Sequence, residues 1–250
     1  MIETTTGTAL YVFGVVASPP PSSVPFAFVE SGPLAAITGE VSLDEYGEQP
    51  LVENLNDRTW VEAKARAHED VLLNVAAATD VLPFRFGTIC NSRGDVRSLL
   101  DGRRDELLAA LERVKGTVEI GAKLWVDRAR LTETEGSAPQ SGRAYLEARR
   151  SAQQHKDEAD AICLETAQAT FERLLRHAVD GVANRPQPRE LTGRNEDMLL
   201  NAAFLIRVDD TALLDEIARL DEELRARGFS LEATGPWPPH NFADVGGATA

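Results

Sequence analysis

The hydrophobic positions in the first half of the chain follow a period of two in some segments and the 3.6-residue period of a helix in others. A proline-rich run, PPPSSVP at residues 19–25, interrupts this pattern, and a Ser-Gly-Pro turn signal separates two short alternating segments. Asn56 or Asp57 is placed to cap a helix. The pattern predicts strands at 9–16, 26–30 and 34–39, a helix at 58–78, a short strand at 81–87 and a helix at 95–114.

The second half of the chain has a clearer order. Residues 117–127 and 198–208 alternate strongly and are the most apolar strands. Pro186 and Pro188 restrict residues 185–191 to an edge strand, because proline has no N–H to donate to a neighbouring strand. The predicted order is a strand at 117–127, a polar loop at 128–142, a long helix at 144–182, the edge strand at 185–191, a strand at 198–208, a helix at 211–227 ending at Gly228, and a strand at 229–234.

This β-α-β-β-α-β order is that of a ferredoxin-like domain, whose first and third strands are central. The two most apolar strands take those positions and the proline-bearing strand falls at an edge, so the features agree. We therefore predict an α+β protein of two domains. Residues 1–115 form a small α+β domain, and residues 116–243 form a ferredoxin-like domain with an antiparallel sheet and its helices on one face. Residues 244–250 are expected to be a disordered tail.

The charge of the chain excludes several classes of partner. Lys and Arg number 26 against 40 Asp and Glu, a formal net charge of −14, which disfavours binding to nucleic acid or anionic lipid. The N-terminus lacks the basic region of a secretory signal, and no apolar run approaches the ~20 residues that span a bilayer. Cys90 and Cys163 match no disulfide-exchange or zinc-ligand spacing. We expect a cytoplasmic protein without a nucleic-acid or membrane partner.

The sequence contains none of the nucleotide-binding, nucleophile-elbow, zinc-protease or EF-hand motifs. The four histidines have no ligand spacing, and His68 lies on the apolar stripe of the helix at 58–78, so a partly buried histidine is the better interpretation. The acidic clusters at 157–160 and 221–223 lie beside basic residues and are typical of solvated helix faces. We expect no enzymatic activity, no cofactor and no metal.

The segment VLPFRFGTIC at 81–90 places Arg85 between Phe84 and Phe86. A guanidinium cannot be buried unpaired, so two interpretations remain. Either the phenylalanines point into the core with Arg85 on the opposite face, or Arg85 binds a partner; the residues themselves favour the first. Pro83 and Gly87, which shape this segment, are candidate structural residues together with Arg85.

The last segment, LEATGPWPPHNFA, combines a stiff proline frame with two large aromatic side chains. Prolines cannot continue a hydrogen-bonded ladder, so we expect the strand to end at Gly235-Pro236. Chain ends usually fray, so Trp237 and Phe242 are either pinned to the body of the protein or presented to a partner. We favour a clasp that folds back over the body, with Trp237 or Phe242 as its anchor.

These two segments together resemble the GvpL/GvpF family of gas vesicle accessory proteins. The resemblance rests on VLPFRFGT, preceded by a helix that carries His68-Glu69-Asp70-Val71, and on TGPWPPHNF at the end of the chain. LYVFGVV at 10–16, GRAYLEARR at 142–150 and NAAFLI at 201–206 extend it, in the same order, over nearly the whole chain. His240 departs from the family, which more often has tyrosine there.

The resemblance implies a two-domain α+β protein that takes part in building gas vesicles, without enzymatic activity or cofactor. It implies as partners the small, hydrophobic major shell protein and other gas vesicle accessory proteins, and a location at the gas vesicle or in the cytoplasm. A factor that handles an apolar subunit needs exposed apolar surface or an open strand edge. Our candidate contact residues lie on the helix-free face of the C-terminal sheet: Lys123, Trp125, Leu205 and Arg207.

Two other functions stay open at this point. Ferredoxin-like domains often bind metabolites, so a small-molecule sensor is the second hypothesis, although it rests on analogy between folds alone. A hydrolase that uses Cys90 and a distant histidine is the third, and nothing next to Cys90 in the sequence supports it.

Overall fold

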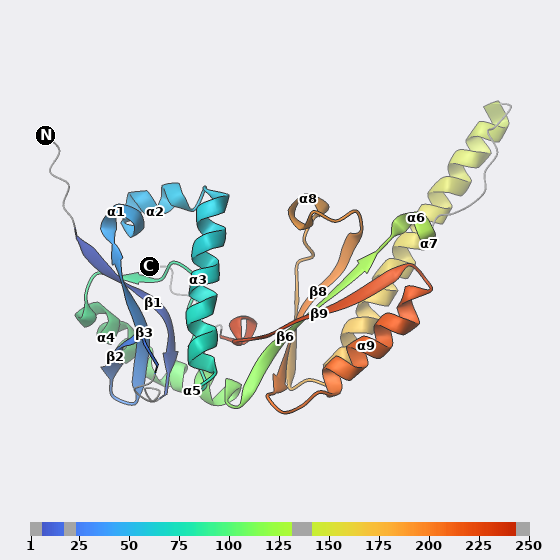
Figure 1. Cartoon of the computed structure of the whole chain (residues 1–250). Coiled ribbons are helices and arrows are strands. Elements are labelled where there is room, and N and C mark those ends of the chain that lie inside the picture. Colours follow the sequence, from blue (N-terminus) through green and yellow to red (C-terminus); the bar gives the residue numbers. More distant parts are fainter. Residues whose placement is uncertain (1–6, 18–23, 132–141, 244–250) are drawn as a thin grey trace, which may run out of the picture. The chain divides into compact units, whose positions relative to one another are not determined.

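The computed structural model describes residues 7–17, 24–131 and 142–243, with the side chains of the helix α7 (Gly142–Leu175) described from residue 149 onward (Figure 1). The expected tail at 244–250 lies outside this part of the chain. The protein divides into two compact units, the described parts of Met1–Val118 with Trp237–Ala250, and Glu119–Pro236. The first boundary lies close to the predicted one at 115. The segment from Trp237 onward groups with the first unit, whereas the sequence had placed it in the second domain.

The first unit contains an antiparallel sheet built around β1 (Thr8–Val16). The strand order is β2-β3-β1-β4, and β5 also pairs with β1. The three strands predicted at the start of the chain are confirmed, although β3 extends three residues further. Of the segment predicted as a strand at 81–87, only the two residues of β4 pair with β1. The other strands are β2 (Ala27–Ser31), β3 (Leu34–Ser42), β4 (Leu82–Pro83) and β5 (Ile89–Cys90).

The helices of the first unit show how local capping sets helix boundaries. The side chain of Asp57 accepts from the N–H groups of Thr59 and Trp60, so α3 (Arg58–Ala76) begins where the sequence predicts. The helix predicted at 95–114 is divided at Gly102, because glycine disfavours helix continuation. Two short helices were not predicted; Ser42 caps the first of them. The remaining helices are α1 (Leu43–Tyr46), α2 (Glu48–Asn54), α4 (Arg93–Gly102) and α5 (Arg104–Val114).

The core of the first unit lies between the sheet and α3. Leu72 and Val75 of α3 are fully buried against Val16 of β1 and Ile37 of β3. Burial of side chains of this size stabilises the folded state by about 1.5–3 kcal/mol each. This packing fixes one face of α3 against β1, and both elements contribute to the site described below.

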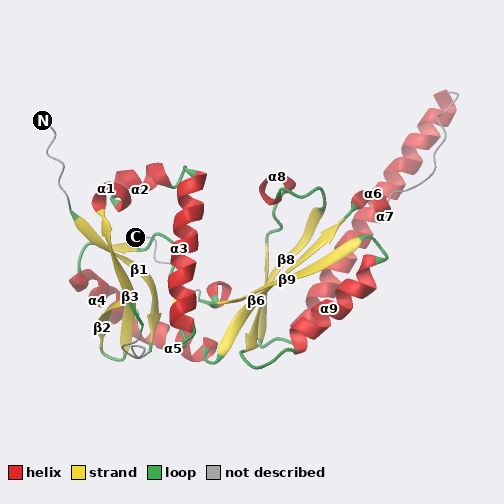
Figure 2. Cartoon of the chain, in the orientation of Figure 1, coloured by secondary structure: helices red, strands yellow, loops and turns green. Residues whose placement is uncertain are grey.

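The second unit contains one antiparallel sheet in the order β7-β8-β6-β9. The central strands, β6 (Thr117–Val126) and β8 (Asp197–Arg207), are the two that the sequence predicted to be central. The long helix α7 (Gly142–Leu175) and α9 (Ala212–Arg225) lie together on one face of this sheet (Figure 2). The other elements are α6 (Arg128–Leu131), β7 (Asp180–Asn184), α8 (Arg189–Thr192) and β9 (Phe229–Trp237).

Three predictions in the second unit are wrong. The edge strand is β7 at Asp180–Asn184, and the predicted strand at 185–191 instead contains Pro186, Pro188 and the short helix α8. The long helix therefore ends at Leu175, seven residues before the predicted 182. The last strand continues through Pro236 to Trp237, whereas the sequence analysis ended it at Gly235-Pro236. β9 lies at the edge of the sheet, where a proline is tolerated because one side of the strand needs no donor.

Candidate functional site: a tyrosine–histidine cluster

Segments far apart in sequence meet around one tyrosine in the first unit. We call this group of side chains the tyrosine–histidine cluster; it comprises Tyr11, Phe13, His68, Phe86 and His240. These residues come from β1, from α3, from the segment after β4 and from the short 3-10 helix η1 (His240–Phe242). The first three segments and the tail are the ones that carry the family resemblance.

Tyr11 is the centre of this cluster and is 3% exposed. Its hydroxyl oxygen lies 2.9 Å from Nδ1 of His68 and accepts a hydrogen bond from the N–H of Gly87, also at 2.9 Å. We assign the hydroxyl of Tyr11 as the donor and Nδ1 of His68 as the acceptor. The neutral imidazole then carries its own proton on Nε2. Tyr11 therefore joins the opening strand to α3 and to the segment after β4.

The segment after β4 is held to β1 by backbone hydrogen bonds as well. The N–H of Phe84 donates to the carbonyl of Phe13 at 2.9 Å, and the N–H of Val12 donates to the carbonyl of Thr88 at 2.9 Å. Gly87 adopts a φ of +82°, a conformation that L side chains rarely take. The glycine thus allows the turn that brings its N–H to Tyr11.

The arrangement of Phe84, Arg85 and Phe86 agrees with the structural interpretation of this segment. Phe84 is buried, Phe86 is half-buried and its ring lies 5.9 Å from that of His68, and Arg85 is exposed. Pro83, in β4, pairs with Gly14 of β1. A binding role for Arg85 stays a prediction.

Burial sets the protonation of the cluster. Desolvation by burial, assisted by the nearby His240 and opposed by Glu69, lowers the pKa of His68 to about 4. Burial raises the pKa of Tyr11 to about 12, although the hydrogen bond from Gly87 acts in the opposite direction. Both groups are therefore neutral near pH 7, and their hydrogen bond joins two uncharged side chains.

The tail is fastened to the first unit through its last residues. Nε2 of His240 lies 2.7 Å from a carboxylate oxygen of Glu69, and Arg113 of α5 donates to the carbonyl of Phe242. Phe242 is 4% exposed, whereas Trp237 is 36% exposed. The end of the tail is thus held to the first unit with Phe242 buried; that the tail acts as a clasp with Phe242 as its anchor stays a prediction. Gly235 and Pro236 precede it in β9 and are exposed.

The chemistry available at this site is that of a packed structural cluster. No group of three or more His, Cys, Asp or Glu side chains that could hold a metal occurs within residues 7–17, 24–131 and 142–243. Cys90 pairs with Leu10 in the sheet, and burial, assisted by Asp95, raises the pKa of its thiol. A raised pKa lowers the thiolate fraction, so the geometry gives no support to a cysteine nucleophile.

The candidate contact residues of the second unit are not equally accessible. Trp125 is 4% exposed and Leu205 is fully buried, while Lys123 is half-buried and Arg207 is exposed. The guanidinium of Arg194 lies 4.4 Å from the centre of the Trp125 ring. Among the described residues, the buried indole N–H of Trp125 has no acceptor.

Sequence reasoning identified His68 as a buried histidine but missed its partner Tyr11 and the pairing of Glu69 with His240. These contacts join positions 57 and 171 residues apart in sequence. The only local signal was that the same segments carried the family resemblance.

The chain is similar to known proteins both in sequence and in structure. The profile of the family described as "Gas vesicle synthesis protein GvpL/GvpF" matches residues 9–244. The chain belongs to the GvpL/GvpF family. Gas vesicle protein L of Streptomyces sp. (strain CB03234) is 35% identical over 230 residues, which cover 88% of this chain and 84% of that protein. Gas vesicle protein F1 of Halobacterium salinarum is 25% identical over 187 residues, 72% of this chain and 68% of that protein.

Two crystal structures of GvpF proteins have the same fold. The gas vesicle protein GvpF from Anabaena sp. PCC7120 superposes with a TM-score of 0.71 at 18% identity, covering 98% of this chain and 99% of that one. GvpF from Microcystis aeruginosa superposes with a TM-score of 0.61 at 16% identity, covering 94% and 99%. As a GvpL/GvpF protein, the chain takes part in gas vesicle formation. None of its described helices is long and apolar enough to cross a membrane.

Proposed function

We propose that this GvpL/GvpF protein acts in gas vesicle assembly by binding the major hydrophobic shell protein and other accessory proteins, without catalysis and without a cofactor. The observation that carries the proposal is the family match over residues 9–244, which includes both units. The second unit supplies a ferredoxin-like scaffold for these contacts; its strand order, β7-β8-β6-β9, supports that assignment.

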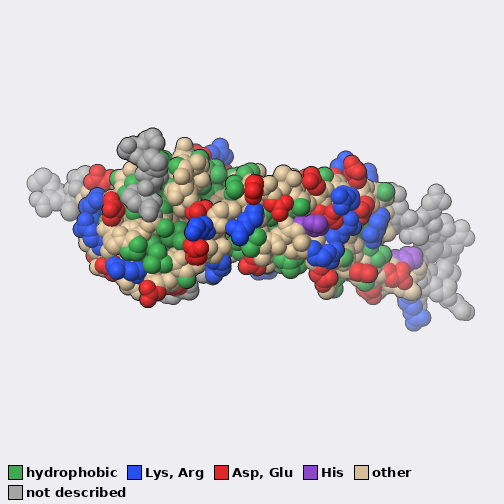
Figure 3. Space-filling view, turned by 90° about the horizontal axis from the view of Figure 1, so that it is seen from below, with side chains coloured by type: hydrophobic (Ala, Val, Ile, Leu, Met, Phe, Trp, Pro, Cys, Tyr) green, Lys and Arg blue, Asp and Glu red, His purple; other side chains and the backbone are tan. Residues whose placement is uncertain are grey.

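The surface of the protein is compatible with specific protein partners. Figure 3 shows acidic and basic side chains intermixed on the face in view, with hydrophobic side chains between them. Large apolar side chains are exposed on the second unit, among them Leu164 at 72% and Val208 at 70%. Single exposed apolar side chains are common on protein surfaces, so they do not by themselves mark a binding face.

The helix-free face of the second sheet, with Lys123, Trp125, Leu205 and Arg207, is our proposed contact. Leu205 is fully buried in the chain alone, so the contact would be made through the other three residues. In the chain alone, Arg194 covers the ring of Trp125 and also pairs with Glu232 at 2.8 Å. A partner that supplies a hydrogen-bond acceptor to the indole N–H and displaces Arg194 gains a buried aromatic contact, which is the kind of residue that dominates protein interfaces.

A pull-down with the major shell protein of the same organism tests both statements. Wild type retains the shell protein, Trp125→Ala loses it, and Arg194→Ala retains more because the ring is uncovered. Leu164→Ser, an exposed position on α7, is the matched control and is expected to behave as wild type. No retention by wild type would contradict the proposed function, and equal retention by wild type and Trp125→Ala would remove this face as the contact.

A further inference from the structure

The strand β7 is an edge of the second sheet and pairs with β8 on its inner side. An edge strand presents unpaired N–H and C=O groups, to which another extended segment can add. Natural proteins usually block such edges with charged side chains, prolines or a covering element. The edge strands of this protein differ in how far such groups block them.

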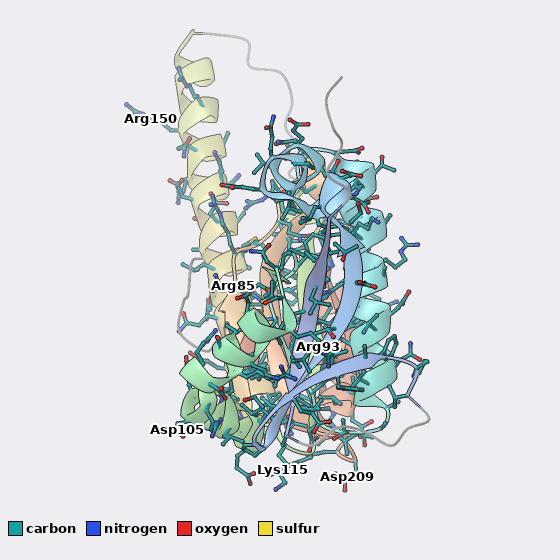
Figure 4. The ribbon with its side chains drawn as sticks, turned by 90° about the vertical axis from the view of Figure 1, so that its left-hand side faces the viewer. Arg85, Arg93, Asp105, Lys115, Arg150 and Asp209 are labelled. Atoms are coloured by element: carbon teal, nitrogen blue, oxygen red, sulfur yellow. The ribbon has the colours of Figure 1, made fainter. Side chains whose placement is uncertain are left out.

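Two other edge strands are blocked by neighbouring helices. In the first unit, Arg93 and Arg97 of α4 donate to the carbonyls of Phe28 and Glu30 on β2, at 3.0 Å and 3.4 Å, and Figure 4 labels Arg93 at this strand. In the second unit, the N–H of Leu231 on β9 donates to Asp221 of α9 at 2.9 Å. Pro236 on β9 also removes a donor.

On the outer side of β7, the bond described is a local one with a side chain of the strand itself, in contrast to the bonds with helices at β2 and β9. The N–H of Gly181 donates to the carboxylate of Asp180 at 2.8 Å, so β8 does not use this donor. Successive residues of a strand point their backbone groups to opposite sides, so the N–H of Ala183 lies on the same outer side. Ala183 is exposed, and Val182 between them is half-buried.

A groove continues the line of β7 at the point where the strand ends. It has a volume of about 700 Å³ and is lined by residues that follow β7 and by the start of β8. The carbonyl of Arg185 accepts from the side chain of Asn201 at 3.3 Å, which holds the backbone at the entrance. The apolar lining comes from Pro186, Pro188, Leu191, Met198 and Leu199.

The charge of the groove is uneven. Asp197 is neutralised by Arg128, whose Nε lies 2.6 Å from its carboxylate, and by Arg189. Arg185 also lines the groove, is exposed, and forms no ion pair with any of the described residues. The groove therefore combines apolar walls with one uncompensated positive charge, which is complementary to a carboxylate beside an apolar side chain.

We propose that β7 and this groove bind an extended segment of a partner protein, which adds to the sheet antiparallel to β7. Because the segment runs in the opposite direction to β7, its N-terminal end lies at the groove. That end carries an apolar residue for the groove and an acidic residue for Arg185, and the following residues alternate along β7. The inference rests on the proposed function only in naming a gas vesicle protein as the source of the segment.

Synthetic peptides test this mode of binding without any vesicle protein. The probe is a fluorescently labelled, N-acetylated Leu-Glu-Val-Thr-Val-Thr-Val-Thr amide, and fluorescence anisotropy measures its binding to the full chain. The glutamate peptide is expected to bind at least about threefold more tightly than the same peptide with lysine, and Arg185→Glu is expected to reverse that preference. Arg66→Glu, an exposed position on α3, is the control and leaves the preference unchanged.

Backbone pairing is tested separately from charge. Ala183→Pro removes the outer N–H and is expected to weaken binding at least about tenfold, with the thermal unfolding midpoint measured to show that the variant is folded. Two further peptides test the same bonds on the unaltered protein: one is N-methylated at the odd-numbered residues and the other at the even-numbered residues. Only the pattern that blocks the N–H groups facing β7 is expected to abolish binding.

Equal binding of both N-methylated peptides, or binding that ignores the glutamate-to-lysine change, would overturn the proposal. Sedimentation that shows a dimer of the wild type and a monomer of Ala183→Pro would overturn it as well, because the occupant of the edge would then be a second copy of this chain. Success with peptides together with failure of the shell-protein pull-down would preserve this binding mode and reject the proposed partner.

Discussion

The hydroxyl of Tyr11 lies 2.9 Å from Nδ1 of His68, and this hydrogen bond joins the first strand of the chain to the helix α3 that packs on the sheet. Both side chains are at most 5% exposed. The same hydroxyl accepts from the N–H of Gly87, so a single oxygen connects three segments of the first unit. The loss of this oxygen leaves Nδ1 of the buried His68 and the N–H of the half-buried Gly87 without their partner.

Replacement of Tyr11 by phenylalanine is therefore expected to lower the free energy of unfolding by about 1–3 kcal/mol, the cost of leaving buried groups unsatisfied. Urea denaturation measures the change. Tyr46→Phe, which keeps a buried ring of the same neighbourhood, is the matched control and is expected to cost less than about 1 kcal/mol. Equal losses in the two variants would contradict the special role of the Tyr11 hydroxyl.

The depressed pKa of His68 predicts a loss of stability in mild acid. The folded protein keeps the imidazole neutral down to about pH 4, whereas the unfolded chain protonates it near 6.5. Between these values the unfolded state binds more protons, so the free energy of unfolding falls as the pH drops, by up to about 3 kcal/mol. Glu69 and His240, which lie 2.7 Å apart, are the charged and titratable side chains beside His68.

The difference between wild type and His68→Gln isolates this contribution, since glutamine can accept from Tyr11 but does not titrate. Denaturation curves at several pH values from 4 to 7 are expected to show a weaker pH dependence in the variant. Identical slopes in wild type and His68→Gln would show that His68 is not the responsible group.

The buried and exposed aromatic residues of the tail are expected to differ in their effect. Phe242→Ala removes a side chain that is 4% exposed and should cost about 3 kcal/mol, the lower end of the range for a buried phenylalanine. Trp237, at 36% exposed, should cost less than about 1 kcal/mol when changed to alanine. Chemical denaturation of both variants checks the ranking, and a larger loss for Trp237→Ala would show that the tryptophan is the anchor.

A buried carboxylate joins the two long helices of the second unit. Glu216 of α9 is 3% exposed and pairs with Arg173 of α7 and with Arg219. Arg173→Met is expected to cost about 2 kcal/mol, because it leaves the buried charge with a single, more exposed partner.

The double variant Arg173→Met with Glu216→Leu checks the cause, since it removes the charge together with its partner. We expect it to recover most of the lost stability, as measured by thermal unfolding. Additive losses would mean that Arg173 acts by packing and not by pairing with Glu216.

The sequence was sufficient for the elements whose patterns were strong and local. β6 and β8 were predicted because their apolar residues alternate over ten positions, and α3 because Asp57 marks its start. β7 has only five residues, DGVAN, with no such alternation. It pairs with β8, and Gly181 permits a close approach to that strand, because a Cβ there would lie 2.9 Å from the ring of Phe204.

The candidate site could be predicted only in part for the same reason. His68 was recognised because the helical stripe around it is apolar. Its partner Tyr11 and the pairing of Glu69 with His240 depend on how α3, β1 and the tail pack, and no spacing in the sequence encodes such distances. The extension of β9 through Pro236 depends likewise on its edge position.

The grouping of Trp237–Ala243 with the first unit has a consequence for biosynthesis. The second unit, Glu119–Pro236, is inserted into the sequence of the first. The first unit therefore consists of a segment before residue 119 and a segment after residue 236. During translation the first unit cannot bury its His240 and Phe242 contacts until nearly the whole polypeptide has left the ribosome. The nascent protein therefore completes its N-terminal unit last, and a messenger truncated anywhere within the inserted unit yields two incomplete units instead of one finished unit.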